Sequence, residues 1–561
     1  MDSSVIITAD GKPVFPPVFG TGGNEGRLDY SSTFMANLKL LVMDAGNAEL
    51  SKKLLRNSIL GEPVDGFSVS KMGQFDPGHS GGYNQGFGVE EKEFRANPWD
   101  FVLLMEGAVL WASSIGRRQG IGMRGFMRSP FTVRAKAVGY SSSVSGDEQR
   151  ARAEIWAPLW DRPLGVTELK QFIAEGRADV GRHRMARNGI EFAEAATSLG
   201  VDRGIKEFAR YSLLKRRGDS YVALPLGRFP VKARRESDLI KELEPMLDRL
   251  DWLSKEAPAE YTSARHQIDI ALFEVLLRGG ASRLAALMVA MGKMEKILSI
   301  RDHSKKPTIQ PLNGLSPRWL LFADDGSVEF RIAAAIASIG PTGDVGPIRA
   351  NLEPVDPMKS WRWSSHGEQN AWAGHSLSAR FANILARRMM DAERLNCSRN
   401  PLQAALSLSP QDIGCFIDGK VDDGMIENLL FGMMWIRWSD RAKLRPVQEE
   451  LRQRWFEQQS LEPVSRAWAL LKLAFLPEDI RMDGVGSVHI VPEPAVIPTL
   501  RAGRIGDACR IAQRRLYSSG LSPIRSDFPN EEDGTRLAAS LLLPARSHRM
   551  MTKLALVEQR K

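Results

Sequence analysis

Residues 78–82 read GHSGG and match the G-x-S-x-G nucleophile elbow, which would make Ser80 the nucleophile of a serine hydrolase. That elbow needs a buried strand directly before the serine and a helix directly after it, because the strained turn lifts the hydroxyl above the sheet. The flanks here, KMGQFDP and GYNQGFG, predict neither element. We therefore expect a loop that exposes its backbone to a ligand or another chain, not a nucleophile.

Residues 120–125 read GIGMRG and fit the G-x-G-x-x-G pattern of dinucleotide sites. Such a site follows a strand and opens a helix whose N-terminus receives the pyrophosphate. Here the preceding element is predicted as a helix and the following one as a strand, so the βαβ unit is missing. We expect instead a flexible basic loop that contacts a phosphate backbone through its arginines, which are Arg117, Arg118, Arg124 and Arg128.

The histidines and cysteines do not have the spacing of a metal site. His366 and His375 are nine residues apart with only Glu368 between them, which is not a recognised ligand spacing. The three cysteines lie far apart without a C-x-x-C pair, and they are Cys397, Cys415 and Cys509. We expect no metal, no cofactor and no disulfide framework.

Asp324 and Asp325 are the one adjacent carboxylate pair that could suggest a two-metal nuclease. Neighbouring side chains diverge, however, and together with Gly326 they fit a turn at the start of a helix. We expect no catalytic residues and a protein that is not an enzyme. A metal-dependent nuclease and a serine hydrolase remain the enzymatic alternatives.

The positive charge is concentrated in one segment. Residues 112–235 contain 24 Lys and Arg against 12 Asp and Glu, a net +12, whereas the whole chain carries +9. Such concentration is typical of a polyanion partner, most often nucleic acid, although a solvated basic face is the alternative. Arginine outnumbers lysine in the densest stretch, 174–189, which favours bidentate phosphate contacts. Besides the four arginines above, the predicted contact residues are Arg177, Arg182, Arg184, Arg187, Arg203, Arg216 and Arg217.

A second aromatic and basic stretch lies at residues 360–376, SWRWSSHGEQNAWAGHS. Trp361, Trp363 and Trp372 alternate there with Arg362 and the two histidines. Tryptophan beside arginine can stack on unpaired bases. The alternative is that most of these indoles belong to the core.

The elements that must hold these residues differ between the two ends of the chain. Residues 1–100 are Gly-rich, with a predicted helix around 34–43. A buried helix is predicted at 100–118, a strand at 131–140 and an extended segment at 221–231. Two further helices are predicted with stop signals at Gly176 and Gly200, over 166–176 (with Thr167 as N-cap) and 188–200.

From Ser237 onward the apolar spacing predicts mainly helices. They cover 237–253, 262–280 and 282–300, and Ser409-Pro410 is an N-cap followed by proline at the first helical position. Further helices are predicted at 425–438, 461–475, 501–518 and 535–545. The expected fold class is α+β, with a mixed α/β N-terminal region that has long Gly-rich loops and a predominantly helical C-terminal half. The expected domains are 1–235, a basic nucleic-acid-contacting region; 236–420, a helical region; and 421–561, a helical bundle.

The bulk properties are those of a soluble globular protein, with 43% hydrophobic and 25% charged residues. The N-terminus carries Asp2 and no apolar stretch of the kind found in secretory signals. The most apolar segments, 101–116 and 425–436, are too short to span a bilayer, and each contains a Glu. We expect a cytoplasmic protein with no membrane partner.

Several stretches of the sequence, taken in order, form a recognisable set of motifs. They are FGTGGNEGRLDYSSTFMANL, GGYNQGFG with NPWDFVLLMEGAVLWA, SPFTVRAKAVGYSS, EIWAPLW with EGRADVGR, ARNGIEFAEAATSLGVDRGI, FARYSLLKRRGDSYVALPLGRFPV and ACRIAQRRLYSSGL. Together they resemble a known family, the large subunit of the type I-G (formerly I-U) CRISPR effector complex, called the Csx-seventeen family. The resemblance runs from about residue 19 to 230, with a weaker echo near the C-terminus.

The resemblance implies a non-catalytic large subunit of a Cascade-type, RNA-guided surveillance complex for antiviral defence. Its partners would be the guide (CRISPR) RNA, target double-stranded DNA, the other Cascade subunits and a helicase-nuclease recruited in trans. The resemblance also suggests a small-subunit-like role for the C-terminal helices. The remaining alternative is an RNA-binding scaffold unrelated to CRISPR.

The sequence also departs from the family. Members usually begin with a further N-terminal region that has a PLxxYLKALG-like segment and a PWNGGSGF-like loop, and this sequence contains neither. The resemblance therefore assigns no residues to recognition of the motif beside the target or to the 5′ end of the guide RNA.

Overall fold

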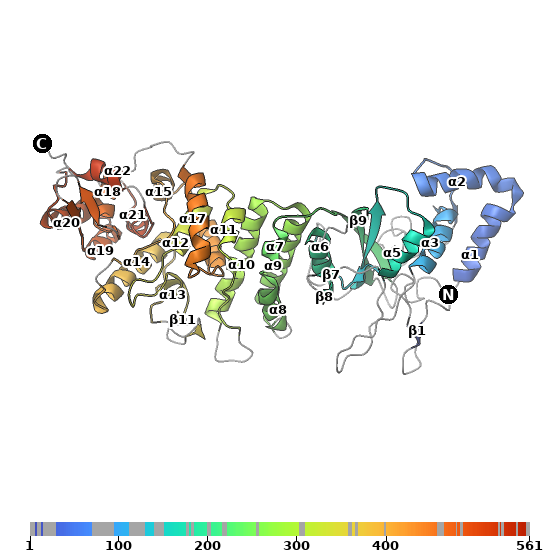
Figure 1. Cartoon of the computed structure of the whole chain (residues 1–561), viewed down its shortest axis with the longest axis horizontal. Coiled ribbons are helices and arrows are strands. Elements are labelled where there is room, and N and C mark those ends of the chain that lie inside the picture. The colour runs from blue at the N-terminus through green and yellow to red at the C-terminus, as the bar shows by residue number, and fades with distance from the viewer. Residues whose placement is uncertain are drawn as a thin grey trace. The chain divides into compact units, whose positions relative to one another are not determined.

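The structure is a computed structural model of the 561-residue chain (Figure 1), and it divides into two compact units, Met1–Ser237 and Asp238–Lys561. Among the described helices, none has both the length and the apolar character needed to cross a membrane. The structure describes residues 6–7, 13–14, 30–69, 95–111, 130–139, 151–175, 179–180, 184–198, 204–215, 221–253, 257–301, 309–356, 362–364, 368–397, 400–456, 465–477, 479–482, 486–524, 528, 532–545 and 548–556.

The first unit begins with a small group of helices. Leu41, Leu54 and Val102 form its buried centre. The last helix of the group starts where Asn97 caps it, because its side chain accepts from the Trp99 N–H. The elements are β1 (Ile6–Ile7), β2 (Pro13–Val14), α1 (Tyr30–Leu38), the π-helix η3 (Lys39–Met43), η4 (Ala45–Asn47), α2 (Ala48–Leu60), β3 (Ser68–Val69), β4 (Arg95–Ala96) and α3 (Pro98–Leu110).

An antiparallel sheet with strand order β10-β9-β6-β5 forms the rest of the first unit. Alternate side chains on one face pack against two helices, and Trp156 stacks on Phe192 with ring centroids 4.4 Å apart. The extended segment predicted at 221–231 is confirmed, whereas the two longest partner strands, β6 and β9, were not predicted. The elements are β5 (Thr132–Val133), β6 (Ala151–Trp160), α5 (Val166–Glu175), β7 (Asp179–Val180), β8 (Arg184–Met185), α6 (Gly189–Ser198), β9 (Ile205–Lys215) and β10 (Tyr221–Pro230).

The strand predicted at 131–140 is wrong for most of its length, because β5 contains only Thr132 and Val133. Phe131 has φ +47°, outside the extended region, and the Val138 N–H turns back to the Lys136 carbonyl at 2.7 Å. Buried contacts of this segment override its alternating pattern. The helices predicted at 166–176 and 188–200 are confirmed, although α5 starts at Val166 and so contains Thr167 instead of being capped by it.

The second unit is helical and is built around α10, which packs against its neighbours α9, α11 and α16. Two glycines let α10 and α16 approach closely. A Cβ added to Gly292 would lie 1.8 Å from the Asn428 carbonyl oxygen, and one added to Gly432 would lie 2.1 Å from that of Met288. The helices are α7 (Ser237–Ile240), α8 (Glu244–Leu253), α9 (Ala259–Arg278), α10 (Ala281–Ile300), α11 (Arg318–Ala323), α12 (Val328–Ala337), α13 (Arg349–Leu352), α14 (Leu377–Arg394), α15 (Pro410–Ile417) and α16 (Asp423–Met433).

The helices predicted at 262–280 and 282–300 are confirmed as α9 and α10. The one predicted at 237–253 is broken into α7 and α8, since Pro245 has no N–H to continue a helix through that point. Ser409 caps α15 in a reciprocal capping box with Asp412, with Pro410 at the first position as predicted. The remaining elements are β11 (Val355–Asp356), β12 (Arg362–Trp363), α17 (Arg441–Phe456), α18 (Arg466–Leu473), β13 (Ile480–Met482), β14 (Gly486–Val488), α19 (Val496–Arg501), α20 (Ile505–Ser518), α21 (Gly534–Ser540) and α22 (His548–Ala555).

The α+β fold class is confirmed: the strands of the larger sheet belong to the first unit, and the second unit is mostly helical. Helices from both sides of residue 420 pack together within the second unit, for example α10 with α16 and α14 with α21. The predicted boundary at 420 therefore falls inside one compact unit, and the boundary at 235 lies two residues from the division between the units.

Candidate nucleic-acid interface

The structure describes two of the eleven arginines that the sequence predicts as nucleic-acid contacts. Arg184 is in β8, which pairs with β7, and Arg187 lies in the short segment between β8 and α6. The others lie outside the described residues: Arg117, Arg118, Arg124, Arg128, Arg177, Arg182, Arg203, Arg216 and Arg217. These nine stay predictions, but their places in the chain order can be related to the described strands.

Strand β9 separates two groups of the predicted arginines. Arg203 precedes Gly204 and the start of β9, whereas Arg216 and Arg217 directly follow its end at Lys215. Ten steps of about 3.3 Å along a strand place the two ends of β9 about 33 Å apart. The backbone at Lys215 also lies opposite Tyr221 at the start of β10. The sheet therefore favours an extended line of contacts over one compact pocket.

Arg187 is held by the first turn of α6. Its guanidinium contacts Glu191 at 2.6 Å, and its backbone N–H donates to the same carboxylate at 2.6 Å. Asn188 caps the helix by accepting from the N–H groups of Ile190 and Glu191, each at 3.0 Å. The Arg187 side chain is still 45% exposed. A phosphate could approach it, but would have to compete with Glu191.

Beneath this segment the sheet buries a cation of its own. Arg210 on β9 contacts Glu154 on β6 at 2.7 Å, donates to the Val138 carbonyl at 3.2 Å, and lies 4.9 Å from the centre of the Trp156 ring. Burial raises the pKa of Glu154 above its ordinary value, and the positive charge of Arg210 opposes that rise. A Cβ on Gly189 would lie 2.6 Å from the same carboxylate. Arg210 therefore ties β9, β6 and the loop before β6 together and is not available to a ligand.

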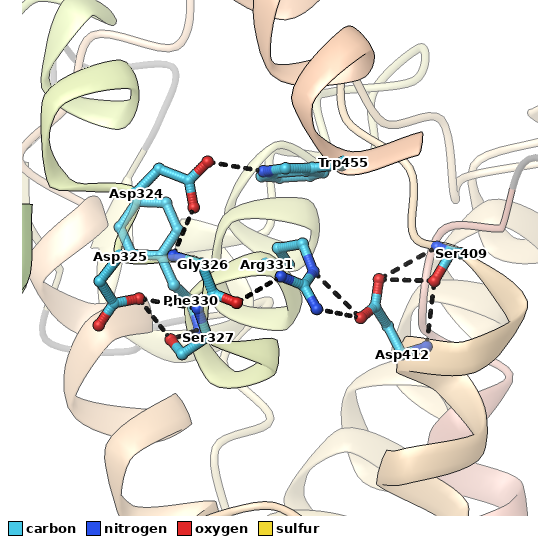
Figure 2. Close-up of polar contacts among 9 residues, drawn as sticks. All are labelled: Asp324, Asp325, Gly326, Ser327, Phe330, Arg331, Ser409, Asp412 and Trp455. Atoms are coloured by element: carbon cyan, nitrogen blue, oxygen red, sulfur yellow. Dashed lines mark hydrogen bonds and ion pairs between the residues drawn. The ribbon is translucent and has the colours of Figure 1, made fainter. Parts of the chain in front are cut away.

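The predicted Asp324–Asp325 turn is confirmed, and the two carboxylates point apart (Figure 2). Asp324 accepts from the Trp455 indole N–H at 3.0 Å and from the Gly326 N–H at 3.2 Å. Asp325 accepts from both the N–H and the hydroxyl of Ser327, the residue that caps α12. Both carboxylates thus serve the turn and the start of the helix.

A third carboxylate near this turn, that of Asp412, is also used within the fold. Arg331 on α12 donates to Asp412 at 2.7 Å and to the Gly326 carbonyl at 2.7 Å, and Asp412 completes the capping box with Ser409 (Figure 2). Within the described part of the chain, no group of three or more His, Cys, Asp or Glu side chains is placed to hold a metal ion.

No protein-family model matches this chain, and no curated protein matches it either. The assignment of candidate residues therefore depends on their chemistry and placement. Ser80, the loop at 120–125 and His366 lie outside the described residues, so the interpretations of the GHSGG and GIGMRG motifs stay predictions.

The tryptophans of the 360–376 stretch separate into different environments. Trp361 lies outside the described residues. Trp372 packs against Phe431, with ring centroids 5.1 Å apart. The guanidinium group of Arg380 lies over the Trp372 ring, 5.1 Å from its centre. Trp363 is half-buried and donates its indole N–H to the Ile309 carbonyl at 2.6 Å. Trp372 is thus part of the packing, whereas Trp363 lines a large cavity together with α17, a helix that the sequence did not predict.

Proposed function

We propose that this chain is a non-catalytic, nucleic-acid-binding large subunit of a cytoplasmic type I CRISPR surveillance complex. It would hold guide RNA and target DNA, contact the other Cascade subunits and support recruitment of a helicase-nuclease. The observation that carries the proposal is the net +12 of residues 112–235, a segment that lies within the sheet-containing unit Met1–Ser237. The family resemblance of the same region supplies the identity of the partners.

The arrangement of the described strands supports the proposal physically. Segments rich in arginine join the ends of rigid strands, and connecting segments on a rigid sheet are a common place for binding residues. Within the described residues, the buried charged side chains of the sheet strands are Arg210 and Glu154, which pair with each other, so the buried part of the sheet carries no net charge. The net charge of the segment therefore has to come from its other residues.

Charge reversal of Arg182, Arg184 and Arg187 to glutamate tests the proposal. We expect the triple variant to bind guide RNA and target DNA at least tenfold more weakly at low salt, with a shallower dependence of log K on log[salt], because phosphate contacts release counterions. Filter binding across a salt titration measures both quantities. A matched control reverses three exposed arginines of the second unit, Arg278, Arg394 and Arg504. Equal binding by the triple variant and the control would contradict the assignment of these residues.

The enzymatic alternatives are tested separately. Incubation of the purified chain with Mg²⁺ or Mn²⁺ and labelled DNA or RNA, together with a fluorophosphonate serine probe, would reveal them. We expect neither cleavage nor labelling. Cleavage lost on Asp324→Ala, or labelling lost on Ser80→Ala, would overturn the non-catalytic proposal.

A further inference from the structure

The second unit contains a cavity of about 1340 Å³ between the loops that follow α12 and α16, the β11–β12 hairpin and the first turns of α17. This exceeds the range of about 300–1,000 Å³ that is usual for small-molecule pockets. It is therefore large enough for a ligand with more than one ring system.

Aromatic rings line two sides of the cavity. Trp363 lies on β12, and Trp438 lies between α16 and α17. Both indole N–H groups are already used inside the protein, that of Trp363 by the Ile309 carbonyl at 2.6 Å and that of Trp438 by the Met433 carbonyl at 3.0 Å. What the two rings can offer a ligand is thus their carbon surface, which suits stacking rather than hydrogen bonding.

Three exposed arginines line the same cavity. Arg441 and Arg445 occupy positions i and i+4 on α17, and Arg362 lies beside Trp363 on β12. All three are exposed, and within the described residues their guanidinium groups have neither an ion pair nor a hydrogen bond. This differs from the surface arginines nearby, such as Arg454, which pairs with Glu450. Unused guanidinium groups beside aromatic surface are suited to phosphate.

The polar groups at the other lining elements are acceptors. The buried Oδ1 of Asn313 has no hydrogen-bond partner within the described structure. Asp344 and Glu368 also line the cavity, in two segments joined by Gln369, which accepts from the Gly346 N–H at 3.0 Å. Asp356 lies opposite Arg362 in the hairpin register. Carboxylate and amide oxygens accept hydrogen bonds from the amino groups of bases, so the lining contains base-binding acceptors as well as the phosphate-binding arginines.

Two buried arginines hold the cavity walls in place. Arg349 donates to the carbonyls of Leu312 at 2.8 Å and Met434 at 2.9 Å. Arg388 donates to the carbonyls of Gly346 at 2.9 Å and Gly340 at 3.2 Å. These hydrogen bonds hold the loops that line the cavity in one conformation, so the site is largely formed before a ligand binds.

We infer that this cavity binds nucleotide units, with an unpaired base stacked on Trp363 or Trp438 and a phosphate held by Arg441 and Arg445. The inference deepens the proposed function and rests on it for the source of the nucleotide, because a nucleic-acid-binding subunit would supply a single strand. A free mononucleotide has the same chemistry and is the other source.

Site-specific photocrosslinking tests the inference. One probe is a twelve-residue oligodeoxythymidine with one 5-iodo-deoxyuridine, and the other is 8-azidoadenosine 5′-monophosphate; crosslinked peptides of the full chain are identified by mass spectrometry. We expect crosslinks at peptides containing Trp363 or Trp438, reduced at least tenfold in Arg441→Glu/Arg445→Glu. Crosslinking by the oligonucleotide alone indicates a strand, and crosslinking by the azido nucleotide indicates a free nucleotide.

The controls separate this inference from the proposed function. Lys443→Glu/Arg452→Glu makes the same charge change on α17 at positions that do not line the cavity, and should crosslink like the wild type. The Arg182, Arg184 and Arg187 reversal should also leave these crosslinks in place, since it removes contacts in the other unit. Absence of cavity crosslinks with both probes, or equal crosslinking in Arg441→Glu/Arg445→Glu, overturns the inference even if the first-unit arginines bind nucleic acid.

Discussion

The two units bury positive charge in different ways. In the first, Arg210 faces one carboxylate, Glu154, and the Trp156 ring. In the second, Arg349 lies between two carboxylates, Glu295 at 2.6 Å and Glu353 at 2.8 Å. One pairing is balanced in charge, and the other has one negative charge too many if both carboxyls are ionised.

The second unit also contains buried cations with no carboxylate bonded to them. Within the described residues, Arg388 donates only to backbone carbonyls and the Asn351 side chain, and burial lowers its pKa to about 10. Lys472 is 1% exposed and donates to the Leu541 carbonyl at 2.6 Å. Backbone carbonyls and a side-chain amide can therefore take the place of a carboxylate partner for a buried cation, and the charge of such a cation depends on pH.

Removing the buried carboxylate of Glu154 should have the largest effect on the free energy of unfolding. Glu154→Ala leaves Arg210 buried without its partner, so we expect a loss of about 3–5 kcal/mol of unfolding free energy. Urea unfolding of the full chain, followed by near-UV circular dichroism, measures it. The double variant Glu154→Leu/Arg210→Met should recover most of the loss. If the single and double variants are equally unstable, packing and not the unpaired charge dominates at this position.

Glu295, one of the two carboxyls that contact Arg349 in the second unit, should make the free energy of unfolding fall as pH rises. Burial raises the pKa of Glu295 from an ordinary 4.5 to about 8, and the negative charge of Glu353 adds to the rise. The folded state thus holds a proton that the unfolded state releases, so unfolding free energy falls between about pH 4.5 and 8. The wild-type free energy of unfolding should be higher at pH 5 than at pH 8, and Glu295→Gln should reduce this difference by about 2–3 kcal/mol.

Urea unfolding at several pH values checks this slope. Glu450→Gln on α17 is the matched control, because its ion pair with Arg454 is exposed to solvent and contributes little to the unfolding free energy. A wild-type slope that persists in Glu295→Gln would place the titrating group elsewhere and remove the contrast between the two arginine sites.

The buried lysine should give a smaller effect of opposite sign. Burial lowers the pKa of Lys472 from 10.5 to about 7, so the unfolded state binds a proton more readily than the folded one between these values. Wild-type stability should therefore rise from about pH 7 to 10.5 on account of this group. Lys472→Met should stabilise the protein by about 1–3 kcal/mol at pH 7 and by less at pH 9.5, since the Leu541 carbonyl loses its donor.

Differential scanning fluorimetry at the two pH values measures the Lys472→Met effect. Lys443→Met on exposed α17 is the matched control and should change the melting temperature little at either pH. A destabilised Lys472→Met at both pH values would show that the hydrogen bond to Leu541 outweighs the cost of burying the amine.

Local signals made part of the fold predictable. The apolar spacing identified α9 and α10, and Ser409-Pro410 identified the start of α15. The turn at Asp324–Asp325 was also correctly predicted, because an Asx turn uses only neighbouring backbone groups. Such features depend on residues within a few positions of one another.

Features that depend on distant partners were missed. Strands β6 and β9 pair residues that are 45 to 63 positions apart in the sequence, from Trp160 with Ile205 to Ala151 with Leu214, and they were not predicted. The alternating pattern at 131–140 predicted a strand, yet only Thr132 and Val133 pair with β6. Arg441 and Arg445 gave no signal either, because nothing near them in the sequence shows that α17 forms one wall of a cavity with Trp363.

Composition and short-range periodicity were sufficient to predict the α+β class, the main helices of the second unit and the position of the basic excess, since these features need no knowledge of the fold. Which of the described arginines are neutralised depends on the tertiary structure. Arg210 meets Glu154 from 56 positions away, and Arg349 meets Glu295 from 54. A charge is neutralised by what lies a few ångströms from it in space, and folding brings those groups together from distant parts of the chain.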